Sequence, residues 1–225
     1  MNYAVIVAAG KSERMGPNVD KAFLSLGTKP VLAYSLLAYE KCQDIDGIVL
    51  VVRKDRLEAA YGLTQMFGYS KVKKIVAGGT RRQDSVANGL QQLNDEVRIV
   101  SVHDGARPCV TPAIISESIK AAKRYGSGVA AGKITDTVKV VENNVSITKT
   151  LDRSNLWTVQ TPQTFKVELL RKALGVVARK RVVVTDESAA VELLGEKVRI
   201  VPVVQPNVKI TTPDDLVLAA TLLRL

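Results

Sequence analysis

The chain has 225 residues, 46% of them hydrophobic and 24% charged, which excludes an intrinsically disordered or collagen-like protein. Because domains usually hold about 100–200 residues, this length favours one large domain with a single sizeable core. Lys and Arg number 32 and Asp and Glu 22, and the resulting net charge of +10 favours polyanionic partners: nucleic acid, an acidic membrane surface or phosphorylated small molecules.

Cysteine content and the lengths of the apolar runs bear on the cellular compartment. The two cysteines, Cys42 and Cys109, match neither a zinc spacing nor a C-x-x-C motif. The N-terminal residues lack the features of a signal peptide, and no apolar run reaches the roughly 20 residues that cross a bilayer. We therefore expect a cytoplasmic protein that does not act in a membrane.

Short β-branched runs alternate with stretches of helical apolar period along the chain. The runs are residues 3–9, 47–52, 74–78, 98–104, 128–134 and 197–204. This alternation predicts an α/β fold with a mostly parallel sheet flanked by helices. Pro30 marks the first position of a helix over 30–42, and Thr212-Pro-Asp-Asp marks the start of the last helix. No linker or repeat interrupts the pattern, so we expect one domain over residues 1–225.

Residues 137–151 depart from this pattern, because they alternate on either side of Asn143-Asn144, a good turn pair. Two interpretations stay open: a protruding hairpin arm, or an antiparallel addition to the main sheet. An arm with little core of its own needs a surface to lie on, and a second subunit is the natural candidate. We expect a dimerisation arm at about 135–155.

Two loops that follow predicted strands have the composition of phosphate or nucleotide sites. The first is Ala8-Ala9-Gly10-Lys11-Ser12-Glu13-Arg14-Met15-Gly16, with Lys21 shortly beyond, and the second is Gly78-Gly79-Thr80-Arg81-Arg82-Gln83-Asp84-Ser85-Val86. Small residues after a strand let backbone N–H groups approach phosphate oxygens. The first loop matches neither a Walker A loop nor a clean G-x-G-x-x-G. For each loop, an ordinary turn with solvated charges or a helix cap remains the alternative.

The chain's one histidine opens a third motif, His103-Asp104-Gly105-Ala106-Arg107-Pro108, at the end of a predicted strand. Because the chain has a single histidine, we do not expect a His-rich metal site or a histidine proton relay. A metal here is expected to be a hard cation such as Mg²⁺, held by carboxylate and phosphate oxygens. The alternative is a structural Asp104–Arg107 ion pair.

Further hydroxyl, amide and basic groups lie in loop-like contexts between apolar runs. They occur in residues 150–157, 160–165, 185–188 and 207–211. Taken separately, these segments are compatible with turns and caps, and Thr185 is placed to cap a helix. Trp157 is expected in the core.

Taken in chain order, these segments spell A-A-G-x-x-x-R-M-G with Lys21, G-G-x-x-R-x-x-S-V, H-D-x-A-R-P, D-T-V-K, T-x-D-R-x-x-L-W-x-x-Q-T-P-Q-x-F, T-D-E-S-A and N-x-K-I-T-x-P-x-D-L. The series resembles the 2-C-methyl-D-erythritol 4-phosphate cytidylyltransferases of the non-mevalonate isoprenoid pathway, from residue 4 to the C-terminus. The leading motif alone marks sugar nucleotidyltransferases in general. Ser12 departs from the glycine that the family often has.

The resemblance implies a Rossmann-like nucleotidyltransferase fold and a homodimer held by the arm. It also implies Mg²⁺-dependent transfer of CMP from CTP to 2-C-methyl-D-erythritol 4-phosphate, giving 4-CDP-2-C-methyl-D-erythritol and pyrophosphate. The catalytic side chains that it implies are four cations: Arg14, Lys21, Arg153 and Lys209. The implied nucleotide site comprises Ala8, Ala9, Gly10, Ser12, Arg14, Lys21, Gly79, Thr80, Ser85 and Asp104, and Asp104 positions the metal. The implied acceptor site comprises Ala106, Arg107, Thr137, Arg153, Thr161, Thr185 and Lys209, and Arg153 and Lys209 orient its phosphate.

The chemistry of such a transfer fits the residues present. A phosphate monoester is already an anionic nucleophile near neutral pH, so its attack on the α-phosphate of CTP needs no histidine, serine or cysteine. The reaction needs in-line positioning and positive charge on the developing oxyanions. Arg14, Lys21 and Mg²⁺ can supply that charge.

Two other functions remain open at this point. A ribitol 5-phosphate cytidylyltransferase has a similar fold and similar nucleotide motifs but a different acceptor. A basic nucleic-acid-binding module is suggested by the pI of about 9.6. Against the second function, 4% of residues are aromatic and the basic residues are dispersed among acids. We therefore expect no nucleic acid partner.

Overall fold

A computed structural model describes residues 1–10, 12–16 and 19–225 of the chain. Its strands are β1 (Asn2–Ala8), β2 (Ser25–Leu26), β3 (Lys29–Pro30), β4 (Gly47–Val52), β5 (Val72–Ala77), β6 (Ile99–Asp104), β7 (Ser127–Lys133), β8 (Lys139–Glu142), β9 (Ser146–Thr150), β10 (Trp157–Lys166) and β11 (Ile200–Pro202). Its helices are α1 (Val31–Lys41), α2 (Leu57–Met66), α3 (Arg82–Leu90), α4 (Pro112–Tyr125), α5 (Val167–Lys180), α6 (Glu187–Glu192) and α7 (Pro213–Leu223). Within the described residues, no helix has both the length and the apolar character to cross a membrane.

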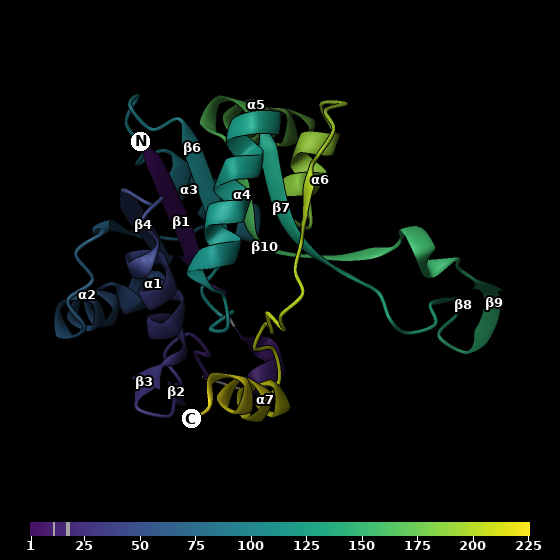
Figure 1. Ribbon diagram of the computed structural model, residues 1–225, viewed down its shortest axis with the longest axis horizontal. Helices are drawn as coiled ribbons and strands as arrows, with labels where there is room; N and C mark the ends of the chain where they lie inside the picture. Colours follow the sequence, from purple (N-terminus) through teal and green to yellow (C-terminus); the bar gives the residue numbers. More distant parts are fainter. Residues whose placement is uncertain (11, 17–18) are drawn as a thin grey trace.

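Seven strands form one twisted sheet in the order β11-β7-β10-β6-β1-β4-β5 (Figure 1). The pairs β6–β1, β1–β4, β4–β5 and β11–β7 are parallel, whereas β10 runs antiparallel to both of its neighbours. Connections of this kind place helices on both faces of a sheet, which leaves its central strands almost continuously apolar. In agreement, every residue of β4 and β6 is buried. The predicted α/β fold with a mostly parallel sheet is confirmed.

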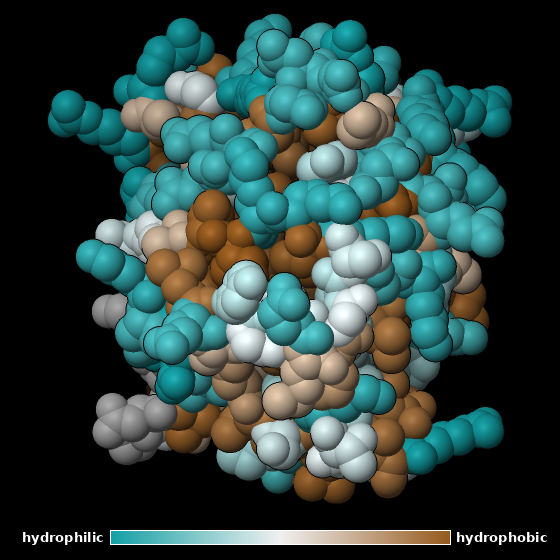
Figure 2. All heavy atoms as spheres, turned by 90° about the vertical axis from the view of Figure 1, so that its left-hand side faces the viewer, coloured by the Kyte–Doolittle hydropathy of each residue, from teal (hydrophilic) through white to brown (hydrophobic). Residues whose placement is uncertain are grey.

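Two apolar clusters fill the spaces between the sheet and its two helical layers. On one face α1, α2 and α4 contribute side chains such as Leu36, Tyr39 and Ile119. On the other face α3, α5 and α6 contribute Val86, Leu170, Val191 and their neighbours. A smaller cluster packs α7 against β2 and the start of α1. Figure 2 shows the side of the molecule that carries α2, opposite the hairpin, where apolar patches are interspersed among charged and polar side chains.

The segment 137–151 forms a hairpin that stands apart from the main sheet and projects sideways from it (Figure 1). Asn143 and Asn144 have φ angles of 52° and 57°, and the Val145 amide donates to the Glu142 carbonyl at 3.1 Å. Two positive φ angles at the centre of such a turn match the right-handed twist of the flanking strands. The arm interpretation is therefore confirmed, and the antiparallel addition to the main sheet is wrong.

Several local expectations were wrong. Strand β10 was not predicted, because its polar Gln, Thr and Pro residues read as loop. Trp157 is only partly buried, since it lies at the edge where β10 leaves the sheet and Lys133 lies over its ring.

The expected starts of two helices and the length of one strand were also wrong. Pro30 precedes α1 as its N-cap and belongs to β3. Asp186, not Thr185, caps α6, because its carboxylate reaches the Ala189 amide at 2.9 Å. Strand β11 is much shorter than the predicted run 197–204.

Candidate active site

A cleft of about 930 Å³ lies at the carboxyl ends of β1, β4, β5 and β6. Open α/β sheets bind ligands at this edge, because the loops that leave parallel strands converge there. The cleft is lined by Val7, Ala9, Gly10, Lys21, Arg53, Lys54, Asp55, Arg56, Gly78, Gly79, Thr80, Arg81, Arg82, Ser85, Asp104 and Lys209. Nine of these residues carry a charged side chain, seven of them positive, so the cleft suits a polyanionic ligand.

The Gly78–Ser85 loop presents its backbone to the cleft because glycine is required at its start. A side chain at Gly78 would collide with Ala9, and one at Gly79 would meet Asp84. The Ser85 hydroxyl accepts a hydrogen bond from the Gly79 amide at 3.0 Å and donates one to the Arg81 carbonyl at 3.2 Å. The sequence-predicted residues Gly79, Thr80 and Ser85 therefore lie together on one wall.

The loop after β1 places Ala9 and Gly10 in the cleft lining, whereas Ala8 is buried within the strand. Ser12 has a φ of 58°, a left-handed conformation that glycine adopts more easily than serine. Its hydroxyl accepts a hydrogen bond from the Lys21 amide at 3.2 Å. Arg14 is exposed on the short 3₁₀ turn Glu13–Met15. Lys11 lies outside the described residues.

Lys21 points its charge into a region that already holds other cations. Burial lowers the pKa of Lys21, the charges of Lys209 and Arg14 lower it further, and Asp104 opposes them. Its chain neighbour Asp20 is buried and lies 3.2 Å from Arg56 Nε, and burial raises the pKa of Asp20. This pair joins the Lys21 segment to the turn after β4, which also lines the cleft.

Asp104, the last residue of β6, is the centre of the site's polar network. Its Oδ1 lies 3.0 Å from Arg82 Nε, and its Oδ2 lies 2.8 Å from Lys209 Nζ and 3.7 Å from Arg107 Nε. Burial by itself would raise the pKa of Asp104, but the three cations outweigh it and hold the pKa well below its usual range. Asp104 is therefore ionised at any physiological pH.

Thr161 of β10 lies directly behind Asp104. Its hydroxyl accepts a hydrogen bond from the Asp104 amide at 3.0 Å and lies 3.1 Å from His103 Nδ1. His103 is completely buried, and that burial lowers its pKa to about 3. A histidine that stays neutral and has no access to solvent supports the strand end structurally and does not face the cleft.

The segment that carries Lys209 is tied to the loop after β6. Arg107 donates to the Asn207 carbonyl at 2.7 Å, the Ile210 amide donates to the Ala106 carbonyl at 2.8 Å, and Asn207 Nδ2 donates to the Thr161 carbonyl at 2.8 Å. Ala106 and Arg107 therefore contribute to the site by holding Lys209 opposite Asp104.

Three of the sequence-predicted acceptor residues do not reach this cleft within one chain. Thr137 precedes β8 and Arg153 follows β9, so both belong to the projecting arm, and Arg153 Nη1 donates to the Thr135 carbonyl. Thr185 is exposed just before α6. The structure thus brings Lys21, Asp104, Thr161 and Lys209 together and leaves these three outside.

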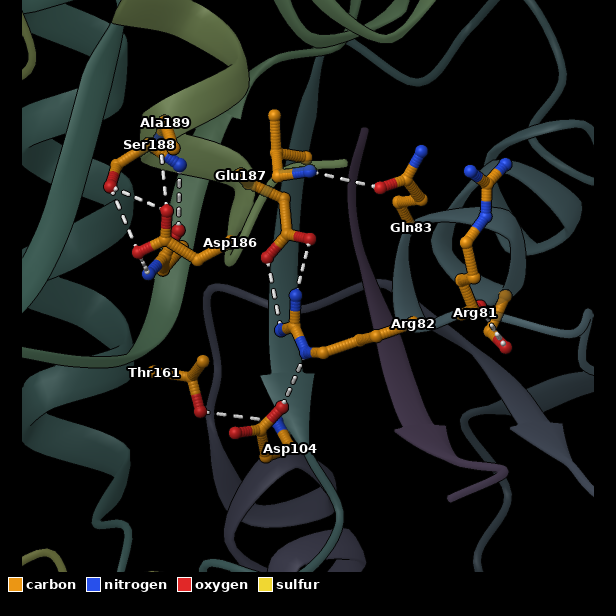
Figure 3. A network of polar contacts seen from close by, with 12 residues as sticks. Arg81, Arg82, Gln83, Asp104, Thr161, Asp186, Glu187, Ser188 and Ala189 are labelled. Carbon is orange, nitrogen blue, oxygen red and sulfur yellow. Dashed lines mark hydrogen bonds and ion pairs between the residues drawn. The ribbon is translucent and has the colours of Figure 1, made fainter. Parts of the chain in front are cut away.

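Sequence reasoning missed the roles of Arg82 and Glu187. Arg82 Nη1 and Nη2 donate to the two carboxylate oxygens of Glu187 at 2.6 and 3.0 Å, while its Nε contacts Asp104 (Figure 3). Burial opposes the charge on Arg82, but Glu187 and Asp104 together raise its pKa further above the usual value. Both residues stand inside the quoted motifs, as the arginine of G-G-x-x-R and the glutamate of T-D-E-S. Those motifs were the signal that could have found them.

Comparison with known proteins shows the family to which the chain is related. The family model described as 2-C-methyl-D-erythritol 4-phosphate cytidylyltransferase matches residues 2–225. The chain belongs to this family. Enzymes of that name from Dehalococcoides mccartyi and Alkaliphilus oremlandii are 45% and 40% identical to it, each alignment covers 98% of this chain, and they cover 95% and 94% of those relatives.

Solved structures agree with this assignment to the family. The 4-diphosphocytidyl-2C-methyl-D-erythritol synthase of Anaerococcus prevotii superposes with a TM-score of 0.86 at 29% identity, covering 100% of this chain and 98% of that one. The 2-C-methyl-D-erythritol 4-phosphate cytidylyltransferase of Thermus thermophilus gives 0.81 at 30% identity, with complete coverage of both chains. The predicted family, its nucleotidyltransferase fold and its cytidylyltransferase class are confirmed.

Proposed function

We propose that this cleft is where the chain transfers CMP from CTP to 2-C-methyl-D-erythritol 4-phosphate and releases pyrophosphate. The observation that carries the proposal is that Lys21 and Lys209 face the ionised Asp104 in a cleft whose walls are the backbone of two glycine-containing loops. Such a cleft offers backbone N–H groups and fixed positive charge to a nucleoside triphosphate.

The two loops divide the nucleotide between them in this proposal. Gly79, Thr80 and Ser85 face the nucleoside, because these three lining residues are themselves uncharged, whereas the phosphates require the cationic side of the cleft. The triphosphate lies along Ala9 and Gly10 toward Ser12, Arg14 and Lys21. Ala8 supports this loop from within β1.

The transfer itself requires charge and alignment and does not require a general base. The acceptor phosphate is anionic, so it attacks the α-phosphate of CTP directly. Lys21 and Arg14 stabilise the negative charge that shifts onto the equatorial oxygens and the departing pyrophosphate. The lowered pKa of Lys21 reports unfavourable burial among cations, and an incoming triphosphate relieves it.

Asp104 can take part in holding Mg²⁺, although no group of three or more His, Cys, Asp or Glu side chains that could bind a metal occurs in the described part of the chain. Mg²⁺ usually keeps several waters and binds one or two carboxylates together with substrate phosphates. An ionised carboxylate that faces a triphosphate cleft fits that pattern. When bound, the ion would neutralise charge on the phosphate oxygens.

The acceptor site is proposed to need a second copy of the chain. One end of the cleft is formed or supported by Lys209, Thr161, Ala106 and Arg107, and Thr185 lies just before α6. Thr137 precedes β8 and Arg153 follows β9, so both belong to the arm that projects from the sheet (Figure 1), and we propose that they reach the cleft of another subunit. Arg153 is then positioned to bind the acceptor phosphate with a forked contact.

Domain organisation and cellular location complete the proposal. Because the seven-stranded sheet draws strands from both halves of the chain, residues 1–225 are proposed to form one nucleotidyltransferase domain that includes the arm. Both cysteines are free thiols, which favours a reducing compartment, and we propose that the enzyme acts in the cytoplasm.

A pyrophosphate-release assay with CTP and a panel of acceptor phosphates tests this function. We expect turnover with 2-C-methyl-D-erythritol 4-phosphate that depends on a divalent cation, and little turnover with ribitol 5-phosphate. Strong selectivity for ribitol 5-phosphate would overturn the acceptor. No pyrophosphate release with any acceptor would overturn the function.

A further inference from the structure

Glu187 is a buried carboxylate to which the proposed function gives no role. Glu187 is 2% exposed, and its two carboxylate oxygens accept hydrogen bonds from the two terminal nitrogens of Arg82 at 2.6 and 3.0 Å (Figure 3). This bidentate contact joins α6 to the start of α3, across 105 residues of sequence. The contact requires two N–H groups of one planar guanidinium, which Arg has and Lys lacks.

The bidentate contact with Glu187 determines which nitrogen of Arg82 is left to contact Asp104. Because Glu187 occupies both terminal nitrogens, the side-facing Nε–H is directed at Asp104 Oδ1, 3.0 Å away. Asp104 therefore receives a single hydrogen bond from Arg82. Its other oxygen stays turned toward Lys209, 2.8 Å away.

The chain on either side of Glu187 is held by hydrogen bonds to two glutamine side chains. Gln163 of β10 donates to Asp186 at 2.9 Å and accepts from the Ser188 amide at 3.0 Å. Gln83 of α3 donates to the Val182 carbonyl at 3.2 Å and accepts from the Val184 amide at 3.0 Å. The chain that carries Glu187 is therefore anchored on both sides, and its carboxylate accepts from both terminal nitrogens of Arg82.

We propose that Glu187 is a positioning residue for the transfer: by holding both terminal nitrogens of Arg82, it keeps Asp104 in its single Nε contact and leaves the second Asp104 oxygen for Lys209 and the ligand. This inference rests on the proposed function. Without Glu187, the nearest carboxylate that the Arg82 fork can bind is Asp104, and a forked Arg82–Asp104 pair would displace Lys209.

A purely structural ion pair is the alternative that the test must separate, because breaking a buried pair also destabilises a fold. The variants are Glu187→Gln, Arg82→Gln and the double variant, each measured for kcat, KM for CTP and thermal unfolding. Glu192→Gln is the matched control, because Glu192 lies on the same short helix but is exposed.

We expect Glu187→Gln to lower kcat by about tenfold or more while KM for CTP changes by less than about threefold. Since Glu187 acts through Arg82, the double variant should lose no more kcat than Arg82→Gln alone. Glu192→Gln should leave all three measurements unchanged. Wild-type kcat in Glu187→Gln, or losses of kcat that multiply in the double variant, would overturn the proposal.

A second variant keeps the inference testable if Glu187→Gln does not fold. Arg82→Lys keeps the charge, but an ammonium group cannot grip Glu187 with a fork and still contact Asp104 from the side. We expect the same loss of kcat in a folded protein, and wild-type kcat would overturn the proposal. A wild-type protein without pyrophosphate release would instead contradict the proposed function.

Discussion

At the scale of single residues, the site is organised by one carboxylate among cations. Asp104 meets Arg82, Lys209 and Arg107, which hold it ionised despite its burial. Removing its charge therefore leaves three cations without their shared partner. This residue and Lys21 carry the most direct predictions.

Asp104→Asn is nearly isosteric but removes the charge that a hard cation requires. We expect kcat to fall by about a hundredfold or more, with a native circular dichroism spectrum. Titration of Mg²⁺ in steady-state assays measures the effect. A Mg²⁺ dependence equal to that of the wild type would make Asp104 a structural residue.

The lowered pKa of Lys21 predicts that activity falls at alkaline pH, which gives an alkaline limb in the pH profile. Its charged form is the active one and its pKa is lowered from 10.5, so kcat/KM for CTP should be intact below that lowered pKa and fall as pH rises through it. Bound triphosphate favours the charged form, and the limb in kcat should therefore lie at higher pH.

Lys21→Arg supplies the control for this limb, because a guanidinium stays protonated throughout the range. We expect a slower enzyme whose kcat/KM does not fall at high pH. If the same alkaline limb persisted in Lys21→Arg, another group would be responsible for it.

At the scale of elements, the cap of α7 secures the segment that carries Lys209. Asp215 Oδ2 accepts from the Thr211 and Thr212 amides, both at 2.8 Å, and from the Thr212 hydroxyl at 3.1 Å. Burial alone would raise the pKa of Asp215, but these hydrogen bonds lower it below its usual value. The stabilisation is therefore present above the unfolded-state pKa and is lost as pH falls through the folded-state pKa.

Asp215→Ala should cost about 1 kcal/mol of unfolding free energy at neutral pH, and the difference from the wild type should shrink in acid. Thermal unfolding at several pH values measures it. The neighbouring exposed acid gives the control, since Asp214→Ala removes only a helix-dipole interaction of roughly 0.3 kcal/mol. Equal losses in the two variants would contradict the capping argument.

The elements also show where sequence reasoning succeeded. Strands β4 and β6 were predictable because their β-branched runs are buried on both faces. Strand β10 was not, because Gln163 and Thr164 are polar and Pro162 lies at an irregularity in its pairing with β7. Tertiary partners satisfy those polar groups: Asp186 for Gln163 and Ser118 for Thr164.

Part of the candidate site was likewise predictable from the sequence, and part of it was not. Loops that follow strands could be located from local composition, so Gly79, Ser85 and Asp104 were predictable as neighbours. The fork between Arg82 and Glu187 was not, because it depends on how α6 packs beside α3, and no local pattern encodes that contact.

At the scale of the whole molecule, the arm is the feature that stands apart from the main sheet. Among the residues that the structure describes, its strands pair with each other and with no further strand, and Val145 and Ile147 are 83% and 65% exposed. An isolated two-stranded hairpin is marginally stable in water, so the arm is expected to pack on a second copy. The predicted dimer should therefore have two clefts, each completed by the other chain's arm.

Mixing two defective subunits tests whether the clefts are shared. A heterodimer of an Arg153→Ala subunit and a Lys21→Ala subunit contains one composite cleft with both residues intact, and it should recover about half of the wild-type turnover. Homodimers of either variant should be nearly inactive and serve as controls. Heterodimers without recovered activity would show that each cleft uses its own chain's Arg153, and a fully active monomer without the arm would exclude a shared cleft.

A crystal structure with CTP bound is the decisive measurement, since the proposed role of each cleft residue depends on where the nucleotide lies. We expect the nucleoside to lie against Gly79, Thr80 and Ser85. The triphosphate should lie along Ala9 and Gly10 beside Lys21, with its α-phosphate on the side of Asp104 and Lys209. CTP bound outside this cleft, or with its triphosphate turned away from Lys21, would contradict it.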